Sequence, residues 1–369
     1  MIIGVTREIK RDEYRVGMTP AGVEVLTQAG HKVLIEREAG LGSGLADAEY
    51  AQYGAQIVES PGDIFRRADM VVKVKEPQPE EIAKIQPGQV LFTYFHFAAD
   101  RQRTKGIVSS GGVAIAYETV RDSAGQMPLL TPISEIAGKM SIQEGAKYLE
   151  RPMYGRGILL GGVPGVEPAT VVIIGGGVVG TNAAKVAAGF GARVIIMDVN
   201  IDRLRYLDDV MSANVHTIYS DLYMIRQHIS EADLVIGAVL IPGAKSPTLL
   251  TKDYLAKMKQ GAVIVDVCVD QGGCCETIRP TTHSDPIYEV DGVIHYGVAN
   301  MPGAVSRTST FALTNATLPY VVRLANLGYK RAAAADPGLA QGIDVQEGWV
   351  TNQAVAETFN MEFRPVELE

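Results

Sequence analysis

The 369-residue chain has no long uninterrupted hydrophobic run, because polar residues break its apolar stretches well before they reach membrane-spanning length. No amino-terminal charged-then-apolar targeting signal is visible. An excess of basic residues is also missing, and the net charge is −8. Since nucleic acids and anionic membranes both demand a basic face, we expect neither as a partner.

Cysteine is scarce. The three cysteines are Cys268, Cys274 and Cys275, an odd set with two adjacent members, and it suggests no disulfide framework. We therefore expect a reduced, cytoplasmic protein. A content of 47% hydrophobic and 21% charged residues is typical of a globular enzyme, and the length suits two domains.

One glycine-rich stretch organises the chain. Gly175, Gly177 and Gly180 have the G-x-G-x-x-G spacing, which provides a tight turn, close approach to a pyrophosphate and tight helix–strand packing. The pattern predicts a buried strand over residues 170–174 before the loop and a helix over residues 178–188 after it. A helix N-terminus offers N–H groups and a positive dipole to phosphates.

The next predicted strand, over residues 193–199, supports a dinucleotide site over an ordinary glycine-rich turn. It contains Asp198, about where an acid grips the adenosine ribose. A carboxylate there favours NAD and disfavours the 2′-phosphate of NADP.

Strands and helices alternate through most of the chain. This pattern predicts an α/β fold with two Rossmann-like, doubly wound parallel-sheet domains. Residues 131–149 read as a helix crossing between domains, and the helix over residues 309–327 lies outside the alternation. We predict a discontinuous substrate domain of residues 1–130 plus 306–369 and an NAD-binding domain of residues 131–305.

Two cations at the ends of predicted elements are candidate carboxylate ligands. Arg15 offers a planar fork that can hold a carboxylate with two hydrogen bonds. Lys75 closes a predicted strand over residues 70–75, just before Pro77 turns the chain. The alternative for both is a solvated surface charge.

His96 and Asp270 are candidates for proton chemistry. His96 follows an apolar, aromatic strand, a position that suits a general acid–base as well as a structural histidine. Asp270 follows a buried strand and precedes paired glycines, so it is either a residue of the cofactor cleft or an ordinary turn former.

Together these stretches carry a resemblance to the family of bacterial NAD-dependent alanine dehydrogenases and transhydrogenase NAD-binding subunits. The similar motifs occupy residues 15–20, 73–77, 94–96, 132–138, 161–166, 175–180, 270–273 and 300–303.

The resemblance implies that Arg15 and Lys75 bind substrate and that His96 and Asp270 carry proton chemistry. It also implies an NAD site, with no metal, lined by residues from many segments. These are Ser134, Gly175, Gly177, Val178, Val179, Gly180, Asp198, Arg203, Ser220, Val239, Leu240, Val267, Val269, Asp270, Arg279, Val298, Ala299, Asn300 and Met301.

The implied reaction is the reversible oxidation of L-alanine to pyruvate and ammonia, in a homohexamer. Arg15 and Lys75 are expected to hold the substrate carboxylate, while His96 exchanges protons with water and nitrogen. Asp270 is expected to stabilise the cationic intermediates. The alternatives are the NAD-binding subunit of a proton-pumping transhydrogenase, a non-catalytic nucleotide-binding protein and a saccharopine-forming dehydrogenase.

Overall fold

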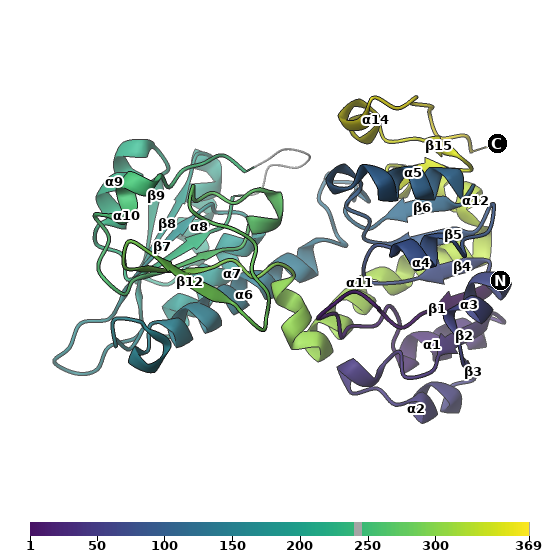
Figure 1. Cartoon of the computed structure of the whole chain (residues 1–369), viewed down its shortest axis with the longest axis horizontal. Helices are drawn as coiled ribbons and strands as arrows, with labels where there is room; N and C mark the ends of the chain where they lie inside the picture. Colours follow the sequence, from purple (N-terminus) through teal and green to yellow (C-terminus); the bar gives the residue numbers. More distant parts are fainter. Residues whose placement is uncertain (240–245, 369) are drawn as a thin grey trace. The chain divides into compact units, whose positions relative to one another are not determined.

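A computed structural model describes residues 1–239 and 246–368 and divides into two compact units (Figure 1). Unit 1 comprises Met1–Ile133 and Gly303–Glu369, and unit 2 comprises Ser134–Pro302. The chain thus enters unit 2 within helix α6 (Thr131–Tyr148) rather than after residue 130. It returns after Pro302 rather than after residue 305.

Unit 1 is built on an eight-stranded sheet in the order β3-β2-β1-β4-β5-β6-β14-β15. The first six strands pair in parallel, and the chain moves outward from β1 to β3 before returning to the other side of β1 with β4. The strand order therefore reverses between β1 and β4. The strands are β1 (Ile2–Val5), β2 (Lys32–Glu36), β3 (Gln56–Val58), β4 (Met70–Val72), β5 (Val90–Thr93), β6 (Val113–Ala116), β14 (Ile343–Gln346) and β15 (Trp349–Val350).

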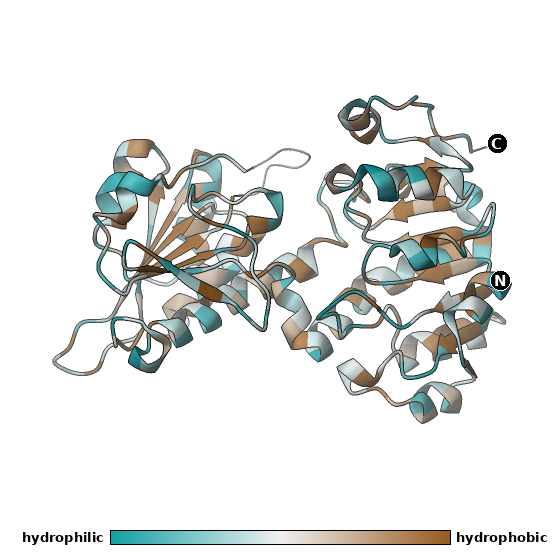
Figure 2. Ribbon diagram, in the orientation of Figure 1, coloured by the Kyte–Doolittle hydropathy of each residue, from teal (hydrophilic) through white to brown (hydrophobic). Residues whose placement is uncertain are grey.

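The sheet of unit 1 is buried on both faces, as expected for parallel strands covered by helices. Val90 and Phe92 of β5 pack in one hydrophobic core, whereas Leu91 packs in the other. The strands are accordingly hydrophobic along most of their length (Figure 2). The α-helices of this unit are α1 (Pro20–Gln28), α2 (Asp47–Gln52), α3 (Pro61–Arg67), α4 (Pro79–Ile82), α5 (Arg101–Ser109), α11 (Ser306–Leu327), α12 (Tyr329–Ala334), α13 (Pro337–Ala340) and α14 (Gln353–Phe359).

Unit 2 has a seven-stranded sheet in the order β9-β8-β7-β10-β11-β13-β12. Its parallel part follows the doubly wound order of dinucleotide-binding domains, with the reversal between β7 and β10. Its elements are β7 (Thr170–Ile174), α7 (Val178–Gly189), β8 (Arg193–Asp198), α8 (Ile201–Val210), β9 (Val215–Tyr219), α9 (Leu222–Ile229), β10 (Leu234–Gly237), α10 (Lys252–Leu255), β11 (Val263–Asp266), β12 (Ile287–Val290) and β13 (Val293–Tyr296).

Antiparallel strands at the edges depart from the all-parallel prediction. β12 forms a hairpin with β13 through Asp291 and Gly292, both with positive φ, which is the conformation that a two-residue hairpin turn requires. In unit 1, β14 pairs antiparallel with β6, and β15 pairs antiparallel with β14. Within the described residues, no helix is both long and apolar enough to cross a membrane.

Candidate active site

The candidate substrate residues of unit 1 follow neighbouring strands of its sheet. Arg15 follows β1, Lys75 follows β4 and His96 follows β5. These strands are adjacent and parallel, so the segments after them emerge at one edge. That edge includes the reversal of strand order between β1 and β4, where ligands of doubly wound folds bind.

Arg15 is a buried cation with a defined partner. Its side chain is 2% exposed, and its Nε and Nη2 donate to the carboxylate of Glu13 at 2.7 and 2.6 Å. Burial opposes ionisation of Glu13, but the charge and hydrogen bonds of Arg15 outweigh it and lower the Glu13 pKa to about 2. Solvated surface charge is therefore the wrong description of Arg15. Glu13 binds the edge of the guanidinium formed by Nε and Nη2, and these two hydrogen bonds fix the plane of the Arg15 side chain.

Lys75 is buried, and the nearby charges of Glu76 and Glu13 act on its ammonium without forming an ion pair. It is 9% exposed, and its Nζ makes no hydrogen bond or ion pair within the described residues. Burial and then the positive charges of Arg15 and Lys10 lower the Lys75 pKa to about 8. Two cations held together in a poorly hydrated place attract an anion, and a carboxylate is the natural one.

The strand before Lys75 is shorter than predicted, because β4 ends at Val72. Beyond that point side chains bond to the main chain. Tyr117 donates its hydroxyl to the carbonyl of Lys73 at 3.0 Å, and Thr93 donates to the carbonyl of Lys75 at 2.9 Å. These contacts fix the segment that carries Lys75.

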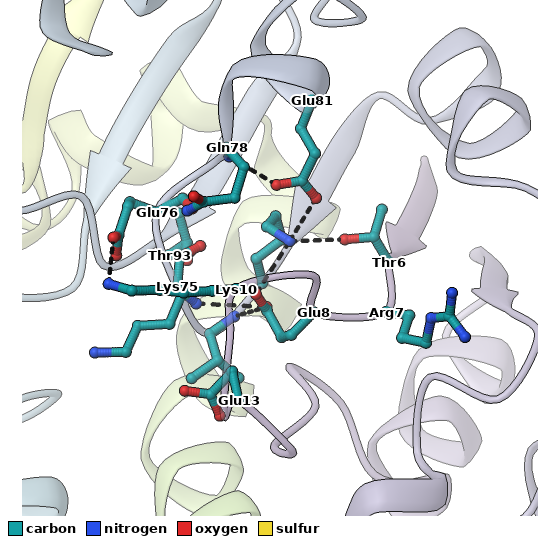
Figure 3. A network of polar contacts seen from close by, with 12 residues as sticks. Thr6, Arg7, Glu8, Lys10, Glu13, Lys75, Glu76, Gln78, Glu81 and Thr93 are labelled. Atoms are coloured by element: carbon teal, nitrogen blue, oxygen red, sulfur yellow. Dashed lines mark hydrogen bonds and ion pairs between the residues drawn. The ribbon is translucent and has the colours of Figure 1, made fainter. Parts of the chain in front are cut away.

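Lys73 lies in a buried network beside the candidate site, and its partners Thr6, Glu8 and Glu81 are labelled in Figure 3. Its ammonium contacts Glu81 at 2.7 Å, Thr6 Oγ1 at 3.0 Å and Glu8 at 3.2 Å. Glu8 also accepts the main-chain N–H of Val74 at 2.7 Å. Burial raises the Glu8 pKa to about 7, although Lys73 opposes the rise. The network is structural, and it anchors the chain on the amino-terminal side of Lys75.

His96 is exposed, whereas the aromatic residues before it are buried. Its ring stacks on Tyr94 with centroids 5.9 Å apart and an interplanar angle of 7°. Tyr94 is fixed in turn, since its hydroxyl donates to the carbonyl of Leu129 at 2.5 Å. The imidazole is thus oriented on one face and accessible to a reactant, as a general acid–base must be.

In unit 2 the glycine loop has room where a phosphate would need it. A Cβ on Gly175 would lie 2.4 Å from the carbonyl oxygen of Ala238, and one on Gly180 would lie 1.8 Å from that of Gly175. A Cβ on Gly177 would meet nothing within 4 Å. Since Gly177 caps α7, the first N–H groups of that helix face this open position. The loop therefore fits the pyrophosphate of a dinucleotide.

Asp198 lies at the end of β8 and is hydrogen-bonded to the same glycine loop. Its carboxylate accepts the N–H of Gly176 at 2.7 Å and that of Asn200 at 2.8 Å. Arg203 donates to the Gly176 carbonyl and to Thr181 Oγ1, both at 2.6 Å. A carboxylate in this place suits ribose hydroxyls and repels a 2′-phosphate.

The other predicted cofactor residues lie beyond strand ends or on nearby segments of unit 2. Ser220 follows β9 and donates its N–H to the Asp198 carbonyl at 3.0 Å. Leu240 falls outside the described residues. Ser134 lies on α6, and Arg279 precedes β12. The remaining residues follow strands of the sheet: β10 is followed by Val239, β11 by Val267, Val269 and Asp270, and β13 by Val298, Ala299, Asn300 and Met301.

Asp270 is exposed on a short 3₁₀ helix, Val269–Gln271, whose loop is held by buried Asp266. The Asp266 carboxylate accepts the N–H groups of Cys268, Cys274 and Cys275 at 2.9, 2.7 and 3.1 Å. Burial raises the Asp266 pKa in spite of these hydrogen bonds. The cysteines are free thiols.

Several acids that support the site were not predicted from the sequence. Glu8 and Glu13 follow β1, Glu118 follows β6 and Asp266 ends β11. Their position at carboxyl ends of strands was the available signal. Within the described residues, no group of three or more His, Cys, Asp or Glu side chains could hold a metal ion.

Two protein-family models match this chain, one in its amino-terminal part and one in its carboxyl-terminal part. Residues 4–137 match the family described as "Alanine dehydrogenase/PNT, N-terminal domain". Residues 141–353 match "Alanine dehydrogenase/PNT, C-terminal domain".

Individual relatives are similar along nearly their whole length. Alanine dehydrogenase of Methanococcus maripaludis is 54% identical, over 100% of this chain and 99% of that protein. Alanine dehydrogenase of Bacillus subtilis is 53% identical, over 100% of this chain and 97% of that protein. A solved structure of L-alanine dehydrogenase has a TM-score of 0.94 at 54% identity and covers 98% of this chain and 99% of that one. A transhydrogenase from Sinorhizobium meliloti, 24% identical with a TM-score of 0.81 over 96% of this chain and 100% of that one, shares the fold.

Proposed function

Because the chain belongs to the alanine dehydrogenase/PNT family, we propose that it interconverts L-alanine with pyruvate and ammonia and uses NAD. The single observation that carries the proposal is the pair of buried cations at the strand reversal of unit 1. Arg15 and Lys75 are 2% and 9% exposed, and the Lys75 ammonium makes no ion pair within the described residues. The carboxylate of an anionic substrate can form an ion pair with this ammonium.

The substrate carboxylate binds the Lys75 ammonium and the Arg15 guanidinium. Glu13 compensates for the burial of Arg15, because its charge and hydrogen bonds raise the Arg15 pKa against the effect of burial. The guanidinium thereby fixes the plane of the carboxylate, while Lys75 adds a point charge.

His96 carries the proton transfers. NAD, when bound, supplies the acceptor for the hydride that leaves the α-carbon of alanine. His96 takes a proton from the water that attacks the resulting iminium carbon, and it returns a proton to nitrogen as ammonia leaves. Asp270 stabilises the positive charge of these intermediates.

NAD is the proposed nucleotide because Asp198 ends β8, where an acid would bind the ribose hydroxyls and repel a 2′-phosphate. Gly177 leaves room for the pyrophosphate at the start of α7, and the other predicted residues of unit 2 complete the lining. The homohexamer rests on the family resemblance, and the cytoplasmic location is supported by the free thiols of Cys268, Cys274 and Cys275.

The decisive experiment is an initial-rate assay with a panel of small L-amino acids, comparing NAD with NADP. We expect turnover with L-alanine and NAD. His96→Ala and Asp270→Ala should lose turnover, by about 10²-fold or more for the histidine, and both should retain NADH binding.

Near-normal turnover of both variants would remove their catalytic assignment. NADH binding by the wild-type protein without turnover of any amino acid would instead favour a transhydrogenase subunit or a non-catalytic nucleotide-binding protein. A requirement for 2-oxoglutarate and lysine would indicate a saccharopine-forming dehydrogenase.

A further inference from the structure

The main chain at His96 adopts a conformation that a histidine rarely takes. Its φ and ψ are 50° and 47°, in the left-handed region, where the Cβ crowds the backbone. Such a residue persists only where its surroundings determine it. The loop that carries His96 must therefore be held by specific contacts.

Glu118 supplies those contacts. One carboxylate oxygen, Oε1, accepts the N–H of His96 at 2.6 Å and that of Phe95 at 3.0 Å. The other, Oε2, lies 3.4 Å from the Phe95 nitrogen. Hydrogen bonds to an ionised carboxylate are stronger than those between neutral groups.

The topology of unit 1 explains why Glu118 reaches this place. Strands β5 and β6 are parallel neighbours, with Thr93 opposite Ala116. Phe95 and Glu118 each lie two residues beyond that pair, at the edge where the ladder ends. The chain turns away at His96, so the Glu118 carboxylate replaces the main-chain acceptor that a continued strand would have provided.

We propose that Glu118 is a positioning residue, which sets the direction of the His96 imidazole by holding the main chain of residues 95 and 96. The inference rests on the proposed function, in which His96 transfers protons. The carboxylate accepts from the main-chain N–H groups of Phe95 and His96. Tyr94, stacked against the ring, supports the imidazole from one face, whereas Glu118 fixes the backbone from which it projects.

Two variants separate the hydrogen-bond acceptor role of the Glu118 side chain from the effect of its negative charge. Glu118→Ala removes the acceptor, so the loop relaxes and the imidazole moves. Displacement of a catalytic group by about 1 Å can lower a rate by about 10²-fold, and kcat should fall by roughly that factor, with the KM for pyruvate changing less than about threefold. Glu118→Gln retains an acceptor oxygen without the charge and should keep kcat within about tenfold of wild type.

The readouts are kcat, the KM for pyruvate and the pH profile of kcat/KM. Amide hydrogen exchange of the peptide that contains residues 95 and 96 is measured as well. Exchange should accelerate in Glu118→Ala and stay slow in Glu118→Gln. Glu49→Ala is the matched control, since Glu49 accepts the N–H of Ala46 at 2.7 Å in the same unit, at the start of α2. It should leave kcat and the exchange of residues 95 and 96 unchanged.

Wild-type kcat in Glu118→Ala, or equal losses of kcat in the Ala and Gln variants, would overturn the proposal. Unchanged exchange of residues 95 and 96 in Glu118→Ala would also overturn it. His96→Ala is assayed in parallel. If that variant keeps turnover, the proposed role of His96 fails, and the exchange measurement still decides whether Glu118 holds the loop.

Discussion

At the scale of single residues, several ionisable side chains of unit 1 have pKa values shifted from their ordinary values. Glu13 stays ionised because Arg15 binds it, whereas Glu8 and Lys75 are shifted toward neutrality by burial. The same groups surround the proposed carboxylate site. Their titration therefore gives direct tests of the proposed function.

The Lys75 ammonium predicts a pH dependence of pyruvate binding. Its folded pKa is about 8, so the charge is present below pH 8 and is lost as the pH rises. Pyruvate affinity for the NADH complex should decrease above pH 8 and approach a tenfold loss per pH unit. The measurement is a pyruvate titration of that complex from pH 6.5 to 10 without ammonia.

Lys75→Arg provides the comparison, since a guanidinium keeps its charge throughout this range. Its pyruvate affinity should be lower at neutral pH, because the geometry differs, but nearly independent of pH. A wild-type affinity that stays constant to pH 10 would contradict the role of Lys75.

Glu8 predicts a pH dependence of stability. Its folded pKa, about 7, is above the ordinary value of 4.5, so the folded protein holds this proton more tightly than the unfolded chain. The free energy of unfolding should therefore decrease as the pH rises from 4.5 to 7, by at most about 3 kcal/mol from this group. Glu8→Gln mimics the protonated carboxyl and should remove that decrease.

Thermal unfolding midpoints of both proteins at pH 5, 6, 7 and 8 test the prediction for Glu8. The difference between Glu8→Gln and wild type should grow in favour of the variant with rising pH. Parallel curves would show that Glu8 does not titrate in this window. Glu49→Gln, at the exposed start of α2, controls for loss of a carboxylate elsewhere in unit 1.

At the scale of elements, local patterns predicted the strands and helices around the sites well. Thr19 and Pro20 begin α1, as the sequence indicates, with Thr19 accepting the N–H of Gly22. The prediction was wrong for the end of β4, which stops at Val72. Continuous burial extends past Val72 to Lys75. There the hydroxyl groups of Tyr117 and Thr93, from the β6 and β5 side of the sheet, donate to the carbonyls of Lys73 and Lys75.

The glycine loop before α7 gives a prediction at this scale. Gly180→Ala forces a methyl group against the Gly175 carbonyl and should lower the free energy of unfolding by about 1–3 kcal/mol. Gly177→Ala meets open space and should leave stability within about 1 kcal/mol, since its φ of −67° suits alanine. Its methyl group would occupy the proposed pyrophosphate position, so the Kd for NADH should rise about tenfold or more.

Thermal unfolding without nucleotide and fluorescence titration with NADH measure the two effects of the glycine variants. Each glycine serves as the control for the other. Unchanged NADH affinity in Gly177→Ala would contradict the placement of the pyrophosphate.

At the scale of the whole molecule, the chain has two compact units with separate hydrophobic cores. Substrate residues gather in unit 1, and most of the proposed nucleotide residues lie in unit 2. Variants of Arg15 and Asp198 should thus act independently when NADH binds without substrate.

A double-mutant cycle tests that independence. Asp198→Ala should raise the Kd for NADH about tenfold, because the carboxylate that binds the ribose hydroxyls is lost. The ratio of the Kd for NADPH to the Kd for NADH should decrease for the same reason. Arg15→Lys should weaken the binding of pyruvate and leave the binding of NADH unchanged. The change in NADH binding free energy caused by Asp198→Ala should agree within about 0.5 kcal/mol in both backgrounds. A larger coupling would contradict independent contributions of the two residues.

The amino-acid sequence by itself determined the local features of this protein: the α/β alternation, the glycine loop, and the charged or imidazole groups after apolar strands. These follow from interactions among residues near in the chain, which periodicity and turn chemistry reveal. Only the tertiary structure decided that β6, β5, β4 and β1 are neighbours, and hence that Glu118 binds the main chain of His96 and that Lys75 is largely buried. Strand order and burial arise from pairing between distant segments, for which a linear pattern carries no register.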